Sequence, residues 1–168
     1  MGIYDIVRFP NTVLKKKAKL VKKVTDEEKK LIKDMFETMY RTGGVGLAAP
    51  QIGISKRIAV INPTGKKEDE LVLINPEILK KSGKDGVEEG CLSLPGPTKF
   101  VKRAQKIKVR FLTIGNETKE NVFEGVLAII IQHETDHLDG KLFVDRLNFF
   151  TRRKLLNKFQ TNIKNKNK

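Results

Sequence analysis

The residues of this chain that are best suited to metal chemistry are also its rarest. Its 168 residues include two histidines and one cysteine. Both histidines lie in QHETDHLDG, residues 132–140, where His133 and His137 are four positions apart. On a helix this spacing places two imidazoles one turn apart on the same face, so both can bind one metal ion. Glu134 follows the first histidine and is suited to act as the general base of a hydrolysis.

A catalytic metal site needs a third protein ligand, and the sequence limits the choice. In zinc peptidases with the pattern H-E-x-x-H, this ligand is commonly a glutamate or histidine further along the chain. Neither type follows His137, and the later acids are Asp139 and Asp145. Cys91 is the remaining candidate, because a thiolate and two imidazoles leave one position open, as in catalytic sites. A zinc peptidase that uses Asp145 or another acid as its third ligand stays open as an alternative.

Two further segments are expected to surround this site. Cys91 belongs to EEGCLSLPG, residues 88–96, in which Gly90 allows close backbone approach and Leu92 offers an N–H beside the metal. Residues 43–53, GGVGLAAPQIG, are interpreted as a loop of small residues that contains Gln51. An amide side chain at that place can donate to a developing oxyanion. This loop is not a phosphate-binding loop, because no Gly-Lys-Ser/Thr follows it.

The elements that must hold these residues can be predicted from hydrophobic periodicity. Thr25 and Glu28 form a capping-box pattern before a helix over residues 26–41. A second helix over residues 125–138 carries both histidines and is apolar around most of its girth, which predicts a buried position. Short segments rich in valine and isoleucine predict strands at residues 57–62, 71–75, 107–112 and 120–124.

Length and composition favour one folded domain and exclude several classes of protein. The chain has a mass of 19.1 kDa and carries 34 Lys and Arg against 20 Asp and Glu, a net charge of +14. A single cysteine allows no intrachain disulfide, which favours a reducing compartment. The longest apolar run covers six residues, 126–131, too short for a membrane span, and no signal peptide is visible.

Three segments together resemble the signature motifs of bacterial peptide deformylases. They are GVGLAAPQ at residues 44–51, EGCLS at residues 89–93 and QHETDH at residues 132–137. They occur in that family's order and spacing, and the resemblance covers essentially the whole chain. It implies an α+β fold with mixed or antiparallel sheets around a central H-E-x-x-H helix, plus an N-terminal and a C-terminal helix. It also implies removal of the N-formyl group from the initiator methionine of nascent polypeptides, with release of formate.

The resemblance also implies a role for each residue of the site. The implied metal ligands are Cys91, His133 and His137. The implied catalytic groups are the general base Glu134 and the oxyanion donors Gln51 and Leu92. The residues implied to bind the substrate are Val45, Gly46, Val87, Gly90, Val126 and Ile129. The implied cofactor is one divalent ion, Fe²⁺ in the cell, for which Zn²⁺, Ni²⁺ or Co²⁺ can substitute.

The charge distribution suggests a second part of the chain. Residues 151–168 carry seven Lys and Arg and no acid, which is half of the net charge. We expect residues 1–150 to form one catalytic domain and residues 151–168 a basic helix or tail. A non-enzymatic protein that binds RNA or the ribosome is a rival class, although no aromatic-interleaved RNA motif is present. The combined expectation is a monomeric, cytoplasmic enzyme that docks on the ribosome through this tail, with no DNA or membrane partner.

Overall fold

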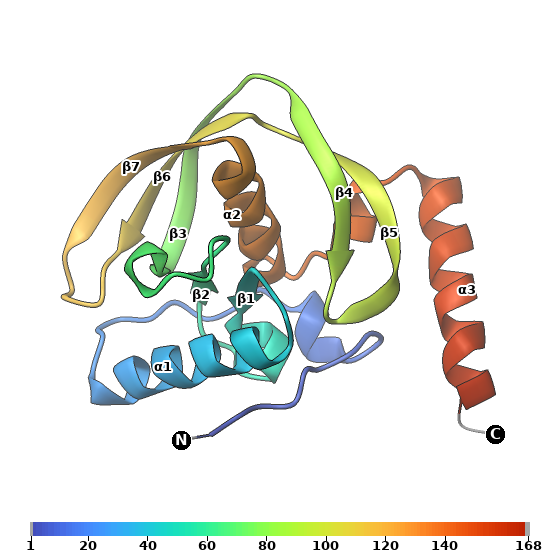
Figure 1. Ribbon diagram of the computed structural model, residues 1–168, viewed down its shortest axis with the longest axis horizontal. Coiled ribbons are helices and arrows are strands. Elements are labelled where there is room, and N and C mark those ends of the chain that lie inside the picture. The colour runs from blue at the N-terminus through green and yellow to red at the C-terminus, as the bar shows by residue number, and fades with distance from the viewer. Residues whose placement is uncertain (1, 167–168) are drawn as a thin grey trace.

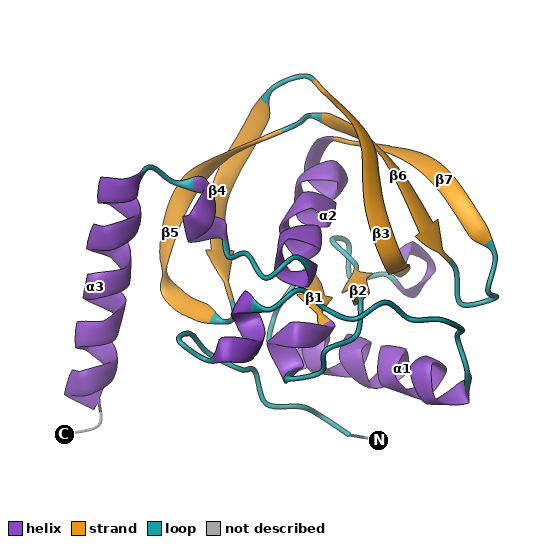
Figure 2. Ribbon diagram, turned by 180° about the vertical axis from the view of Figure 1, so that it is seen from behind, coloured by secondary structure: helices purple, strands orange, loops and turns teal. Residues whose placement is uncertain are grey.

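The computed structural model describes residues 2–166, whose strands form two antiparallel sheets (Figure 2). The larger sheet has the strand order β1-β2-β3-β6-β7. Its strands are β1 (Gly46–Ala48), β2 (Ile58–Ile61), β3 (Leu71–Ser82), β6 (Lys106–Leu112) and β7 (Thr118–Glu124). The smaller sheet consists of β4 (Asp85–Cys91) and β5 (Leu94–Arg103). The expected α+β fold with antiparallel sheets is therefore confirmed.

The first helix, α1 (Asp26–Arg41), has the bounds that the sequence predicts. The carboxylate of Glu28 accepts the backbone N–H of Thr25 at 3.0 Å, so the predicted cap is present. Met35 and Met39 are fully buried, in a hydrophobic cluster that includes residues of β2. Gly43 adopts φ 68°, a left-handed conformation that ends the helix and turns the chain toward β1.

The second helix, α2 (Gly125–Leu138), lies between the two sheets (Figure 1). It follows β7 directly, and Gly125 allows the change of direction because its φ is 60°. The helix contacts β1, β2, β6 and β7 of the larger sheet and β4 of the smaller one. Ala128 and Ile131 are fully buried, as the apolar sequence of this helix predicts. His133, Glu134 and His137 lie on its second half.

Three strands were not predicted: β1, which lies in the segment interpreted as a loop, and the hairpin strands β4 and β5. Gly46–Ala48 is a short strand, β1, that pairs with β2, and Cys91 ends β4. The segment 85–91 holds three acids and two glycines, and 94–103 holds two prolines, so neither shows the alternation typical of a strand. These strands are held by cross-strand pairs such as Val87 with Val101, a contact that local patterning does not reveal.

Strand β3 was predicted, but it continues beyond its predicted end. It was expected to stop at residue 75 but runs to Ser82, with a register irregularity between Ile74 and Glu77. Pro76 lies in this irregularity, because a proline has no N–H to give to the ladder. The extension carries the chain over α2 to the start of β4, and so joins the two sheets (Figure 1).

The C-terminal helix, α3 (Phe149–Lys166), lies beside β5 on the outside of the molecule (Figure 1). Its buried Leu155 and Phe159 join a cluster with Phe9 and Phe143, so this part of the helix is packed rather than free. Residues 167–168 of the expected tail lie outside the described residues. None of the helices within residues 2–166 has the length and apolar character needed to cross a membrane.

Replacing Glu28 tests how far the cap of α1 stabilises the fold. Lys56 and Thr25 hydrogen-bond this carboxylate and hold its pKa at about 2, below the ordinary value of 4.5. Its contribution is therefore present above pH 4.5 and declines as the pH falls toward 2. We expect Glu28→Gln to lower the free energy of unfolding by about 1 kcal/mol at pH 7, measured by urea denaturation.

The matched control is Glu27→Gln, since Glu27 also binds Lys56 but has an exposed side chain and no cap contact. This variant should change stability by less than about 0.5 kcal/mol. The difference between Glu28→Gln and the unaltered protein should shrink below pH 4.5. A difference that stays constant down to pH 3 would contradict the assignment.

Candidate metal centre

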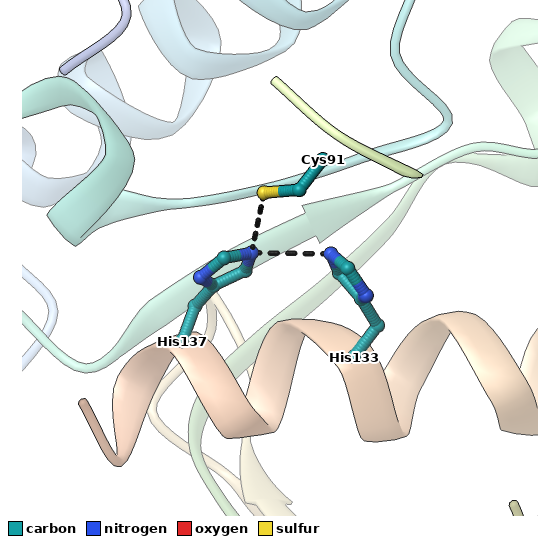
Figure 3. A group of neighbouring side chains, drawn as sticks. All are labelled: Cys91, His133 and His137. Atoms are coloured by element: carbon teal, nitrogen blue, oxygen red, sulfur yellow. Dashed lines mark hydrogen bonds between the residues drawn. The ribbon is translucent and has the colours of Figure 1, made fainter. Parts of the chain in front are cut away.

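The structure brings together the three residues that the sequence proposed as ligands (Figure 3). Cys91 Sγ is 3.3 Å from His137 Nε2, and His137 Nε2 is 3.1 Å from His133 Nε2. All three ligand atoms lie within 4.8 Å of one another. The two imidazoles project from successive turns of α2, and the thiol reaches them from the end of β4. One ion could therefore contact all three groups.

A buried ion-pair network fixes one of these imidazoles. Glu89 Oε2 is 2.8 Å from His133 Nδ1. The same carboxylate accepts two N–H groups of Arg103, at 2.7 and 2.9 Å. Arg103 also donates to Asp136 on α2 at 2.6 Å, and Asp136 is held in turn by Arg146. A carboxylate on Nδ1 places the proton of a neutral imidazole there, which leaves Nε2 free to bind a metal.

The electrostatics of the three groups fit a divalent cation. Burial opposes ionisation of Cys91, yet the imidazoles of His137 and His133 hold the pKa of this thiol well below its ordinary range. Burial also opposes charge on His133, but Cys91 and Glu89 raise the pKa of its imidazole to about 10. The surroundings thus favour a thiolate with positive charge beside it. Cysteine and histidine are ligands that Zn²⁺, Fe²⁺, Ni²⁺ and Co²⁺ accept.

Glu134 is buried beside this group and keeps one carboxylate oxygen available. Its Oε2 has no hydrogen-bond partner among the described residues, and burial raises the pKa of the carboxyl. The other oxygen lies against Gly46, where a Cβ would come within 2.5 Å of Oε1. Glycine at this position therefore leaves the space that the carboxylate occupies. A buried carboxyl with a raised pKa is suited to accept a proton and release it again.

Gln51 faces the thiol from the segment after β1. Its Oε1 accepts the backbone N–H of Ala48 at 2.8 Å, which orients the amide. Its Nε2 is then directed to Cys91 Sγ at 3.6 Å. The residue belongs to a short 3-10 helix, Ala49–Ile52, rather than to the loop that the sequence suggested. The amide N–H groups are thus held beside the candidate ligand Cys91.

A cavity of about 640 Å³ opens beside the candidate ligands. Most of the residues implied by the resemblance line it. They are Val45, Gly46, Gln51, Val87, Gly90, Cys91, Leu92, Ile129, His133 and Glu134. His137 is not part of the lining and is 1% exposed. The structure does not place Val126 in the lining, because this residue lies in the first turn of α2, where it is 62% exposed.

Sequence reasoning missed several residues that shape this site. Ile6 and Arg8, from the N-terminal segment, also line the cavity. Glu89 and Arg103 were missed because nothing local distinguishes a buried glutamate or arginine from an exposed one in so charged a chain. Asp145, the alternative ligand, accepts the N–H of Leu142 and pairs with Arg152, outside the cysteine–histidine group.

Comparisons with known proteins agree with this geometry. The sequence profile of the polypeptide deformylase family matches residues 3–153. A peptide deformylase of Tolumonas auensis is 45% identical over 165 residues, which is 98% of this chain and 99% of the relative. The chain belongs to the polypeptide deformylase family. Members of this family are hydrolases that remove the N-formyl group from nascent polypeptides, and this is the activity of the chain.

Solved peptide deformylases share the fold as well as the sequence. The crystal structure of the Legionella pneumophila enzyme matches with a TM-score of 0.92 and 42% identity, covering 99% of each chain. That of the Thermotoga maritima enzyme matches with a TM-score of 0.83 and 42% identity, covering 88% of this chain and 99% of that one. At 42% identity, the similarity to these two structures indicates a shared family as well as a shared fold.

Replacing Glu89 tests whether the carboxylate on His133 supports metal binding by this deformylase. We expect Glu89→Gln to weaken the affinity for a divalent ion by about 10–100-fold, because the imidazole loses its charged partner. The affinity is measured by competition with a chromophoric chelator. The control is Glu88→Gln, which removes the same charge from the neighbouring, exposed position and should leave the affinity unchanged. Equal affinities of the two variants would contradict this prediction.

Proposed function

We propose that the deformylation reaction takes place in the cavity beside Cys91, His133 and His137, with these three residues as metal ligands. The observation that carries this proposal is the position of Glu134. Its carboxylate is buried, has an oxygen without a partner among the described residues and lines the same cavity as Cys91 and His133. A base, a set of metal ligands and a space for substrate therefore meet at one place.

The cofactor we propose is one divalent ion, Fe²⁺ in the cell, with Zn²⁺, Ni²⁺ or Co²⁺ as substitutes. When bound, such an ion acts as a Lewis acid on the formyl carbonyl and lowers the pKa of water. Cysteine and histidine donors suit all four metals, so the choice of Fe²⁺ rests on the family resemblance. Anaerobic purification with elemental analysis, paired with activity, identifies the ion.

Glu134 is the proposed general base and acid. Its carboxylate takes one proton from the attacking water, whose oxygen bonds to the formyl carbon. The C–N bond then breaks, and Glu134 delivers the proton to the leaving amine. The products are a free N-terminal amine and formic acid, which gives up its remaining proton at neutral pH and leaves as formate. Burial raises the pKa of this carboxyl, which makes it a better proton acceptor than an exposed glutamate.

Gln51 and Leu92 are the proposed donors to the formyl oxygen. Charge develops on this oxygen as the carbonyl is attacked, and a well-placed donor in such a site lowers the barrier by about 3–4 kcal/mol. The hydrogen bond from Ala48 already orients the Gln51 amide, so little reorganisation is needed during the reaction. Leu92 directly follows Cys91 and lines the cavity, which supports a role for its backbone N–H.

The formyl-methionyl chain is proposed to bind as an added strand beside β1. The strand β1 is the first of the larger sheet, so its outer edge is not used by β2. Backbone groups of Val45, Gly46 and Gly90 would hold the peptide. Val87 and Ile129 line the cavity and provide apolar surface for the methionine side chain. For Val126, which lies outside the lining, we propose contact only at the rim.

The rest of the chain is proposed to support this reaction in three ways. We propose that α2 acts as the central helix of the site, which its contacts with both sheets support. Residues 1–150 are the proposed catalytic domain, and the end of the family match at residue 153 supports this boundary. Residues 151–168 are the proposed ribosome-binding segment of a monomeric, cytoplasmic enzyme, supported by their charge.

Glu134→Gln tests the mechanism, because glutamine keeps the shape of the side chain but cannot take a proton. We expect formate release from a formyl-methionyl peptide to fall by about 10²–10⁴-fold. Elemental analysis should show an unchanged metal content, which separates loss of the base from loss of the ion. The control is Glu117→Gln, an exposed carboxylate of the turn between β6 and β7. Activity of Glu134→Gln within tenfold of the unaltered protein would refute the proposed role.

The ribosome proposal is best tested by removing charge from α3 rather than the whole helix, because Leu155 and Phe159 are part of the core. Arg153, Lys154 and Lys158 are exposed and can be replaced together by glutamine. We expect weaker cosedimentation with ribosomes and a salt dependence reduced by about two to three in its log–log slope.

The matched control for this variant replaces the exposed Lys22, Lys23 and Lys30 by glutamine, with the same loss of charge. Turnover of short formyl peptides should be unchanged in both variants. Equal loss of ribosome binding in the two would show that net charge alone matters and would count against a docking role of α3.

A further inference from the structure

A second cavity, of about 650 Å³, lies on another side of the network that holds the metal centre. The chain passes there from β3 into β4 and from β5 into β6, and Figure 1 shows these two bends above α2. Its lining includes the following residues of β3, β4, β5, α2 and the adjoining segments: Lys81, Lys84, Asp85, Gly86, Phe100, Lys102, Arg103, Ala104, Gln132 and Arg146. The deformylation mechanism uses none of this space.

The wall of this second cavity carries positive charge that the protein does not neutralise. Arg103 and Arg146 are balanced by the carboxylates of Glu89 and Asp136. Three lysines of the lining, Lys81, Lys84 and Lys102, have no carboxylate within 4.0 Å among the residues that the structure describes. Asp85 is the acid in the lining, so an excess of two positive charges faces the cavity.

The surroundings of Lys81 are consistent with this excess of positive charge. Partial burial and the nearby guanidinium of Arg146 both lower the pKa of its ammonium, and Asp136 offsets only part of the effect. A positive group held near other positive groups gains most from an added anion. Lysine ammonium groups with an arginine beside them are typical of sites that bind phosphate.

An exposed aromatic ring completes the wall. Phe100 lines the cavity and is 55% exposed, although phenylalanine is usually buried. Its ring lies over Gly86, where a Cβ would come within 2.7 Å of the ring. The glycine thus leaves room for the ring at the cavity wall. An exposed ring next to lysines can stack with a base while the lysines bind phosphate.

We propose that this second cavity binds a nucleotide, with its phosphate at Lys81, Lys84 and Lys102 and its base against Phe100. The volume suits this, because pockets for ligands of nucleotide size usually enclose about 300–1,000 Å³. Two sources share this chemistry, a free mononucleotide and one residue of a single-stranded RNA.

The test uses the full metal-loaded chain and two variants of equal charge loss. Lys81→Ala/Lys102→Ala removes two lysines of the cavity, and Lys22→Ala/Lys23→Ala removes two exposed lysines elsewhere. Adenosine monophosphate is titrated at low salt and followed by amide NMR shifts of Gly86 and Ala104. We expect the cavity variant to weaken binding at least tenfold and the control variant less than twofold. Equal weakening in both variants would overturn the proposal.

The base contact is tested with Phe100→Ala and two probes. We expect this variant to weaken binding of adenosine monophosphate at least fivefold and to leave binding of inorganic phosphate unchanged. Phe150→Ala is the control, since Phe150 is an exposed phenylalanine on α3. An unchanged affinity of Phe100→Ala for the nucleotide would overturn the assignment of the base. Formate release by all four variants should equal that of the unaltered chain.

A single-stranded RNA of ten nucleotides distinguishes the two sources. If RNA binds at least tenfold more tightly than the mononucleotide and loses affinity in the cavity variant, the ligand belongs to a strand. If the cavity variant weakens mononucleotide binding but not RNA binding, the ligand is a free nucleotide. Both results support a nucleotide site. If the cavity variant binds both the mononucleotide and the RNA as tightly as the unaltered chain does, the proposal is refuted.

Discussion

The geometry of the candidate metal centre depends on one buried guanidinium, that of Arg103. Its side chain is 3% exposed and lies on β5, where it binds Glu89 of β4 and Asp136 of α2. The candidate ligands come from these same two parts of the chain, Cys91 from β4 and the histidines from α2. A buried charge without a partner is costly. The guanidinium therefore holds the hairpin of β4 and β5 at a defined position on α2, and the thiol at a defined distance from the imidazoles.

The ion-pair network around Arg103 fixes the relative positions of these elements more than it adds to the stability of the fold. Desolvation of buried ions offsets much of their attraction, so such pairs often add little to the free energy of folding. Removing one partner is different, because the other charge then stays buried without compensation, at a cost of about 3–5 kcal/mol. Glu89 serves two neighbours at once, since it binds Arg103 and also orients His133. The positions of hairpin, helix and imidazole are thus linked through one carboxylate.

Features of the structure could be predicted from the sequence where neighbouring residues determine them, and were missed where distant contacts do. The bounds of α1 and α2 are correct because a capping pair, apolar periodicity and glycine at the ends act within a few residues. The grouping of Cys91 with the two histidines was predicted because the chain has few other ligands of these types. Strands β4 and β5 were missed because their pairing depends on contacts across the hairpin. The pair of Glu89 and Arg103 was missed for the same reason, since burial decides its role and composition does not show it.

The large positive charge of the chain has two different physical roles. Charges at the surface act over distance on association and are screened by salt, whereas buried charges act on position. Glu89 lines the cavity beside the candidate ligands and Arg103 lines the second cavity, so their ion pair forms part of the wall between the two. A phosphate that reached Arg103 would have to compete with Glu89 and Asp136, whose carboxylates already accept three of its five N–H groups at 2.6–2.9 Å. We therefore expect most of the binding energy for an anion to come from the exposed lysines, because the two carboxylates already neutralise the guanidinium that lies between the second cavity and the candidate metal centre.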